Sequence, residues 1–235
     1  MQKEPIILNI ESATGTCSVA VSRGDKLLHL REAGKEFDHS RVLTTLIGDC
    51  LKASGLSLRE IDAVAVSSGP GSYTSLRVGA STAKGICYAL GKPLLKIDTL
   101  QALALGAQKD TPGHGGYYCP MIDARRMEVY CSIFDRQNKL ITGAKAMVIE
   151  ENSFGDLFEA GRKIVFCGTG AEKCQSVLTS PMAVFRPSKC SAANLPSLSN
   201  QQFKSGNFAD IAYFTPFYLK PPNITVPKNM NLLKA

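Results

Sequence analysis

The sequence contains no apolar run of about 18 residues, the length that a membrane-spanning helix needs. Its first residues also lack the apolar centre of a secretory signal peptide. No two of the eight cysteines are spaced as C-x-x-C, so a zinc site is not expected, and without a signal peptide disulfides are not expected either. These absences predict a cytoplasmic protein. Several of the cysteines sit in apolar runs and are expected to act as small buried hydrophobic residues.

Acidic residues are scarce toward the C-terminus, and the chain carries a net charge of +7. From residue 186 onward there are six basic side chains and one acid, Asp210. Such a tail is able to lie against RNA phosphates or an acidic partner, or to stay solvated with no partner. No aromatic-rich RNA-reading motif accompanies it, so the charge alone leaves both interpretations open.

The most informative stretch begins with a short apolar strand at residues 63–66. A glycine turn at residues 69–71 ends that strand. The helix that follows has Ser72 or Thr74 as its N-cap and Gly91 as its terminator. A strand, a glycine turn and a helix N-terminus in this order are able to hold an anion, because free backbone N–H groups converge there. A tight connection that binds no ligand fits the same residues.

The chain predicts two α/β lobes that begin alike. Within residues 1–107, three strands are followed by helix, strand, helix, strand and helix, which makes a complete α/β lobe. The last of these helices, residues 100–107, is expected to have Thr99 as its N-cap. Residues 108–116 are rich in glycine and polar side chains and are typical of a linker. The opening theme then recurs, because a strand ends in an acid at Asp123 as the first strand does at Glu11. The second lobe, residues 108–235, is degenerate and ends in the basic, proline-containing tail.

Two helices of the first lobe carry more apolar or small residues than one sheet face requires. The first is expected to begin after Asp38 and to end at Ser54, and the second follows the glycine turn. Core packing explains both stripes, but a partner helix would fit them as well. The candidate interface residues are Val42, Leu43, Leu46, Ile47, Cys50, Gly79, Ala83 and Cys87.

Residues 69–79 read Gly-Pro-Gly-Ser-Tyr-Thr-x-Leu-Arg-x-Gly. This is the most specific of several pieces by which the chain resembles the TsaB (YeaZ) family, a branch of the actin-like ATPase superfamily. Further matching pieces lie at residues 10–14, 17–20, 39–41, 122–125, 128–130 and 218–220, so the resemblance covers nearly the whole chain.

This resemblance implies an α/β, actin-like ATPase (ribonuclease H-like) fold with two duplicated lobes, and an accessory role without enzymatic activity. The protein is then expected to pair with TsaD, the catalytic paralogue, and to support N6-threonylcarbamoylation of adenosine 37 in tRNAs that read ANN codons. An ATPase, TsaE, would join the complex. The chain alone would form a homodimer, and it would meet tRNA only through the complex, with no membrane involved.

The resemblance also implies that no metal is bound. TsaD carries a metal-binding His-x-x-x-His pair, and the corresponding positions here are Thr99 and Leu103, neither of which replaces an imidazole as a ligand. Catalytic residues are therefore not expected. Any binding of ATP or ADP should be weak, because Glu11 stands where the family usually has Asp and Ser75 where it commonly has Gly. The residues of such a vestigial phosphate pocket would be Glu11, Gly69, Gly71, Ser72, Gly168 and Gly170.

Two other classes of function stay open. One is an enzyme, either a glycoprotease-type metallopeptidase, which would need the absent histidine pair, or an actin-fold kinase, which would need an aspartate in the first loop. The other is an independent RNA-binding protein that uses the basic tail.

Overall fold

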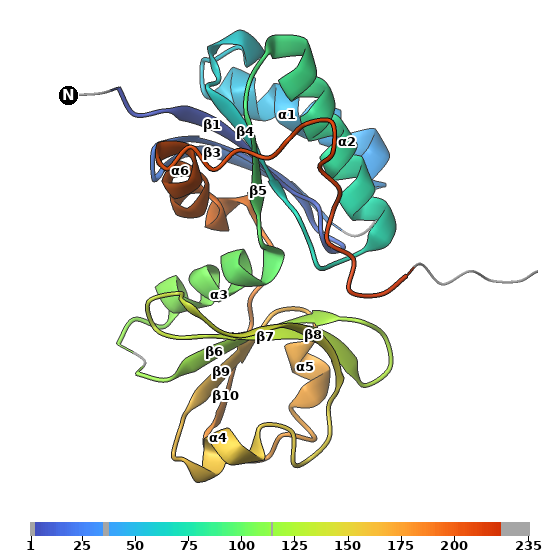
Figure 1. Cartoon of the computed structure of the whole chain (residues 1–235), viewed down its shortest axis with the longest axis vertical. Coiled ribbons are helices and arrows are strands. Elements are labelled where there is room, and N and C mark those ends of the chain that lie inside the picture. The colour runs from blue at the N-terminus through green and yellow to red at the C-terminus, as the bar shows by residue number, and fades with distance from the viewer. Residues whose placement is uncertain (1–2, 35–37, 114, 222–235) are drawn as a thin grey trace, which may run out of the picture.

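The computed structural model describes residues 3–34, 38–113 and 115–221; Lys228 and Lys234 of the basic tail lie outside these ranges. Two five-stranded mixed sheets form two lobes, stacked along the long axis of the molecule in Figure 1. The strand order is β3-β2-β1-β4-β5 in the first lobe and, read in the same direction, β8-β7-β6-β9-β10 in the second. The predicted duplication of one α/β unit is therefore confirmed.

The first sheet is built around a strand that is buried along its whole length. β1 (Ile6–Glu11) pairs antiparallel with β2 (Cys17–Arg23) and parallel with β4 (Ala63–Ser67). β3 (Lys26–Ala33) and β5 (Leu94–Ile97) form the two edges. Asn9 is the polar residue inside β1, and its amide group is satisfied because Ser22 accepts at 3.0 Å and Ser199 donates at 2.7 Å.

Helices α1 (His39–Ala53) and α2 (Tyr73–Leu90) lie side by side on one face of this sheet (Figure 1). A short 3₁₀ turn, η1 (Leu58–Glu60), precedes β4. The predicted caps are confirmed: Asp38 caps α1, Ser72 caps α2, and Gly91 ends α2 with φ of 62°. Glycine suits that last position because it adopts the left-handed conformation without a steric penalty.

The second sheet consists of β6 (Tyr117–Asp123), β7 (Glu128–Phe134), β8 (Leu140–Val148), β9 (Ile164–Cys167) and β10 (Ala183–Arg186). The short helices α4 (Gly155–Glu159) and α5 (Ala171–Cys174) lie on one face. α3 (Thr99–Asp110) packs on the other face and lies between the lobes (Figure 1). Its N-cap is Asp98, whose carboxylate accepts the N–H of Gln101 at 2.7 Å, and not Thr99 as the sequence suggested.

The chain returns to the first lobe after β10. The 3₁₀ turn η2 (Ala192–Asn194), the helix α6 (Pro196–Lys204) and the residues after it pack there, although the sequence placed residues 108–235 in the second lobe. Leu198 joins Ile7 in one core cluster of the first lobe, and Phe214 joins the cluster beneath α1 and α2. α6 therefore covers the sheet face opposite to these two helices (Figure 1). The predicted linker is also shorter, because α3 continues to Asp110.

All eight cysteines are buried and free. The sequence predicted this burial for several of them. In the described ranges, none of the helices combines the length and the apolar character that crossing a bilayer requires.

Candidate functional site

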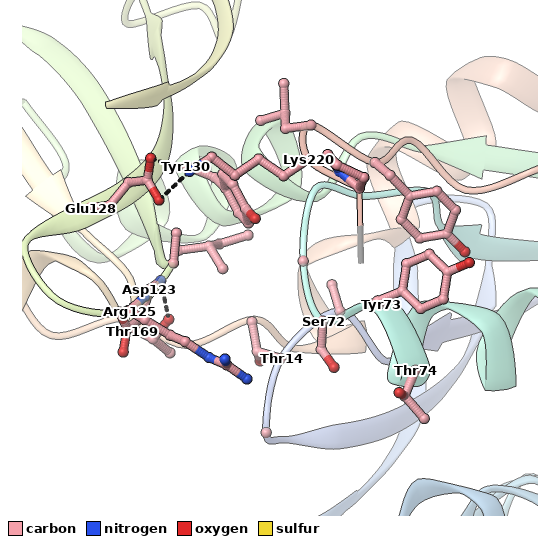
Figure 2. A pocket seen from close by; sticks show the side chains of 18 residues that line it. Thr14, Ser72, Tyr73, Thr74, Asp123, Arg125, Glu128, Tyr130, Thr169 and Lys220 are labelled. Carbon is pink, nitrogen blue, oxygen red and sulfur yellow. Dashed lines mark hydrogen bonds and ion pairs between the residues drawn. The ribbon is translucent and has the colours of Figure 1, made fainter. Parts of the chain in front are cut away.

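A cavity of about 570 Å³ lies between the two lobes. The first lobe contributes the β1–β2 loop and the start of α2, the second lobe contributes the β6–β7 turn, and the C-terminal segment completes the wall (Figure 2). Its volume falls in the range of small-molecule sites. The lining residues with polar side chains are Thr14, Ser72, Tyr73, Thr74, Asp123, Arg125, Glu128, Tyr130, Thr169, Tyr218 and Lys220.

The glycine turn before α2 meets the first loop of the chain directly. The N–H of Ser72 donates to the carbonyl oxygen of Ala13 at 2.7 Å, and a Cβ atom at Gly71 would collide with that same oxygen. Gly71 and Ser72, two residues of the predicted phosphate pocket, both line the cavity. However, a carbonyl oxygen already takes the N–H that Ser72 would offer to an anion. Glycine is needed at position 71 because protein backbone packs against it.

Gly69 serves a different contact from the one that the sequence suggested. Its φ of 107° is in the region that favours glycine, and a Cβ atom there would meet the backbone carbonyl of Phe217. Its N–H donates to Thr99 Oγ1 at 3.0 Å. Gly69 does not line the cavity; it packs against the C-terminal segment and the start of α3.

Glu11 is buried beneath the first loop and does not line the cavity. Its Oε1 accepts the N–H of Ala13 at 2.6 Å. Burial raises the pKa of this carboxyl to about 7, although hydrogen bonds from Ala13, Ser67 and Ser12 act in the opposite direction. Ser75 does not line the cavity either; its hydroxyl donates to that of Ser72 at 3.0 Å. The two departures from the family pattern therefore do not face the cavity.

The glycines of the second lobe are close-packing positions as well. A Cβ atom at Gly168 would meet the carbonyl of Met121, and one at Gly170 would meet Val129 and the backbone of Ile122. Neither glycine lines the cavity; Thr169 between them does, and its hydroxyl accepts the N–H of Asp123 at 3.2 Å.

Charged side chains of the second lobe form the opposite wall, and sequence reasoning did not assign them to a site. Asp123 pairs with Lys173 at 2.5 Å, and Glu128 binds Lys220 of the C-terminal segment at 2.5 and 2.6 Å. Arg125 extends from the β6–β7 turn into the space between the lobes (Figure 2). The signal was present, because residues 122–130 and 218–220 match the family. Nothing in their spacing placed them on one cavity.

Shortly after Asp123, two arginines adopt a backbone conformation that is uncommon for residues other than glycine and asparagine. Arg125 has φ of 74° and Arg126 has φ of 48°. The N–H of Arg125 donates to Asp123 Oδ1 at 2.9 Å, which closes the turn locally. The turn thereby directs the Arg125 side chain toward the first lobe.

The predicted interface residues belong mostly to the first lobe's own core, which is a correction. Leu43, Ile47, Cys50, Gly79, Ala83 and Cys87 are buried within this chain, so a partner cannot contact them. Val42 and Leu46 are half-buried and pack at the edge of the same core. Both helices still have an exposed side. On α2 it presents residues at spacings of three and four: Thr74, Arg77, Ser81, Gly85 and Tyr88.

The two positions that correspond to the paralogue's histidines have structural contacts. Thr99 Oγ1 accepts the N–H of Gly69, and Leu103 is buried among residues of the second lobe. Within the described residues, no three His, Cys, Asp or Glu side chains gather as metal ligands would. Burial and the neighbouring Glu11 carboxylate raise the pKa of the Cys17 thiol to about 11, which makes it a poor nucleophile.

Comparison with known proteins accounts for this combination of features. A family model described as TsaD, tRNA N6-adenosine threonylcarbamoyltransferase, matches residues 35–213, which are 179 of the 235 residues. The tRNA threonylcarbamoyladenosine biosynthesis protein TsaB of Escherichia coli (strain K12) is 28% identical over 221 residues, covering 91% of this chain and 94% of that protein. The tRNA N6-adenosine threonylcarbamoyltransferase of Porphyromonas gingivalis is 34% identical over 127 residues, covering 48% of this chain and 37% of that protein.

Among solved structures, YeaZ from Pseudomonas aeruginosa superimposes with a TM-score of 0.77 at 24% identity, covering 92% of this chain and 100% of that one. That likeness shows that the chain has the fold of YeaZ, and the repeated strand order confirms two α/β lobes of one design. The similarity to the transferase ends well short of that protein's length, whereas the similarity to TsaB and YeaZ spans nearly the whole of both chains. The chain therefore belongs to the family that the TsaD model describes, and within it to the TsaB (YeaZ) branch.

Proposed function

We propose that this protein is a non-catalytic subunit of the complex that transfers threonylcarbamoyl to N6 of adenosine 37 in tRNAs reading ANN codons. The names of its relatives support a role in threonylcarbamoyladenosine synthesis. The observation that carries the accessory role is that Thr99 and Leu103 occupy the positions of the paralogue's metal-binding histidines. Thr99 accepts a hydrogen bond from Gly69 of the glycine turn, and Leu103 packs in the hydrophobic core. A TsaD-type subunit would then supply the chemistry, TsaE would join as a further subunit, and tRNA would be met through the complex in the cytoplasm.

The exposed stripe of α2 supports an interface with that catalytic partner, and we refer to this proposed interface as the joint. Ser81 and Gly85 lie at its centre, and outside the backbone and chain neighbours of α2 itself nothing lies within 4 Å of the place a Cβ would take at Gly85. Small side chains allow another helix to approach closely, and the exposed ring of Tyr88 offers an anchor of the kind that interfaces favour. α1 has a similar exposed glycine, Gly48. The same surface would join two copies of this chain when the partner is absent.

Modification of tRNA in a reconstituted mixture should require both this chain and a TsaD-type partner. Omitting this chain should abolish threonylcarbamoyladenosine formation. Ser81→Arg should keep the fold but weaken association with the partner at least tenfold, about 1.4 kcal/mol, because the charge would be desolvated in the joint. Size-exclusion chromatography of the mixed proteins measures their association, and mass spectrometry of digested tRNA measures the threonylcarbamoyladenosine formed.

The matched control is Asn152→Arg, which adds the same charge to an exposed position of the second lobe. It should leave association and modification unchanged. Modification by this chain with the TsaD-type partner omitted would contradict the accessory role. Full binding by Ser81→Arg would place the joint elsewhere.

Nucleotide binding by the isolated chain should be weak. A carbonyl oxygen already accepts the Ser72 N–H that would meet a phosphate, and Glu11 does not line the cavity. Calorimetry with ATP and magnesium should give a dissociation constant in the high micromolar range or above. Submicromolar binding would overturn this proposal and favour the kinase-like alternative.

A further inference from the structure

The segment that follows α6, residues 209–221, is attached to the first lobe at several points along its length; we refer to it as the C-terminal strap. The N–H of Ala209 donates to the carbonyl oxygen of Leu94 at 2.8 Å. Lys84 of α2 donates to the carbonyls of residues 212 and 214 at 3.2 and 3.1 Å. Phe214 is 8% exposed and completes the core beneath α1 and α2. The strap, red in Figure 1, therefore belongs structurally to the first lobe.

The attachment continues to the edge of the cavity. The N–H of Phe217 donates to the carbonyl of Ser68 at 2.6 Å, beside Gly69, which has no room for a side chain. The ring centroids of Tyr218 and Tyr73 are then 4.5 Å apart. Burial raises the pKa of Tyr218, as expected for a phenol held against another ring. These contacts fix the strap where it leaves the first lobe.

Two residues later the strap reaches the other lobe. Lys220 donates to both carboxylate oxygens of Glu128, at 2.5 and 2.6 Å, and Glu128 is the first residue of β7 in the second sheet (Figure 2). Tyr218 and Lys220 both line the cavity, so the strap crosses from one lobe to the other along its wall. The chain also passes between the lobes at β5–α3 and at β10–η2. A further tie at the cavity restricts hinge motion about those two connections.

We propose that the C-terminal strap is a clamp that fixes the angle between the lobes, and that the Lys220–Glu128 ion pair closes it across the cavity. The two parts of the clamp differ in strength. Phe214 and the backbone hydrogen bonds hold the strap to the first lobe, whereas the Lys220 and Glu128 side chains are 47% and 21% exposed. Water and salt compete for an exposed pair, so it opens first. Opening would widen the cavity while the strap stays on the first lobe.

The test measures the distance between the lobes in the full chain. Cysteines introduced at Arg59 and Lys163, exposed in the first and second lobes, carry spin labels; the native cysteines are buried. Pulsed electron resonance should give one narrow distance distribution for this labelled protein at low salt. Lys220→Met should raise the population of longer distances by roughly two- to fivefold, the range that loss of an exposed ion pair allows. Molar salt should likewise raise the population of longer distances in the labelled protein that keeps Lys220.

Two further variants separate the clamp from general effects of charge. Exchanging the partners, with Lys220→Glu and Glu128→Lys in one chain, should restore the narrow distribution. Lys204→Met breaks a comparable exposed pair, Lys204–Glu4 at 2.9 Å, within the first lobe, and should leave the distribution unchanged. The proposal is overturned if Lys220→Met keeps the narrow distribution, if Lys204→Met broadens it equally, or if the exchanged pair stays broad.

Discussion

Ala83→Arg should unfold the protein, with a loss of about 5 kcal/mol in the free energy of unfolding. Ala83 is fully buried in the cluster between α2 and the first sheet, so an arginine there overfills the core and leaves its charge desolvated. Each effect costs several kcal/mol, and their sum is comparable with the whole stability of a small protein. Circular dichroism during thermal and urea unfolding measures the loss.

Ser81→Arg is the matched control, because it places the same side chain two residues earlier on the exposed side of the same helix. Its free energy of unfolding should lie within about 0.5 kcal/mol of that of the wild type. A folded Ala83→Arg protein that has lost only its partner would contradict the core assignment. In that case Ala83 would belong to the interface that the sequence alone allowed.

Stability should fall as the pH rises from 5 to 8, and Glu11→Gln should remove a large part of that fall. Burial raises the pKa of folded Glu11 to about 7 from its ordinary 4.5, so between these values the folded protein holds a proton that the unfolded chain has released. This stabilising contribution is complete below pH 4.5 and is lost as the pH rises through 7. The full difference is about 3 kcal/mol, at 1.36 kcal/mol for each unit of pKa.

Glutamine is neutral at every pH and keeps an oxygen that can accept the N–H of Ala13. Urea unfolding at pH 5 and pH 8 should therefore show the wild type losing about 2.5 kcal/mol more than Glu11→Gln across that interval. Glu151→Gln, an exposed position on the second lobe, should behave as the wild type does. Equal pH dependence of the wild type and Glu11→Gln would contradict the assignment of a buried, protonated carboxyl.

Local rules predicted the elements of this fold well. Asp38, Ser72 and Gly91 cap or end helices as expected, because each acts on its own neighbouring backbone. The repeated strand pattern likewise predicted two lobes, since the same alternation of elements yields the same sheet. Asp98 displaced Thr99 as the cap of α3 because both residue types accept backbone N–H groups and only the folded backbone selects between them.

The site was harder to predict, since its residues are brought together by contacts that are distant in sequence. The glycines at positions 69 and 71 suggested a phosphate cradle, but a close approach to Phe217 and to Ala13 explains them. From sequence, a glycine required by a ligand and one required by backbone packing look the same. The wall formed by Glu128 and Lys220 joins residues 92 positions apart, and no local pattern encodes such a pair. The apolar stripes of α1 and α2 gave no sign of which side faces the sheet.

The return of the chain end to the first lobe has a consequence for synthesis on the ribosome. The strands of the first sheet are all made once β5 ends at Ile97, yet the face later covered by α6 stays open until about a hundred further residues have followed. Phe214, which completes the core beneath α1 and α2, emerges later still. Until then the first lobe exposes apolar side chains such as Ile7 and Leu95 to other nascent chains and to chaperones. The first lobe thus begins to fold first and finishes last.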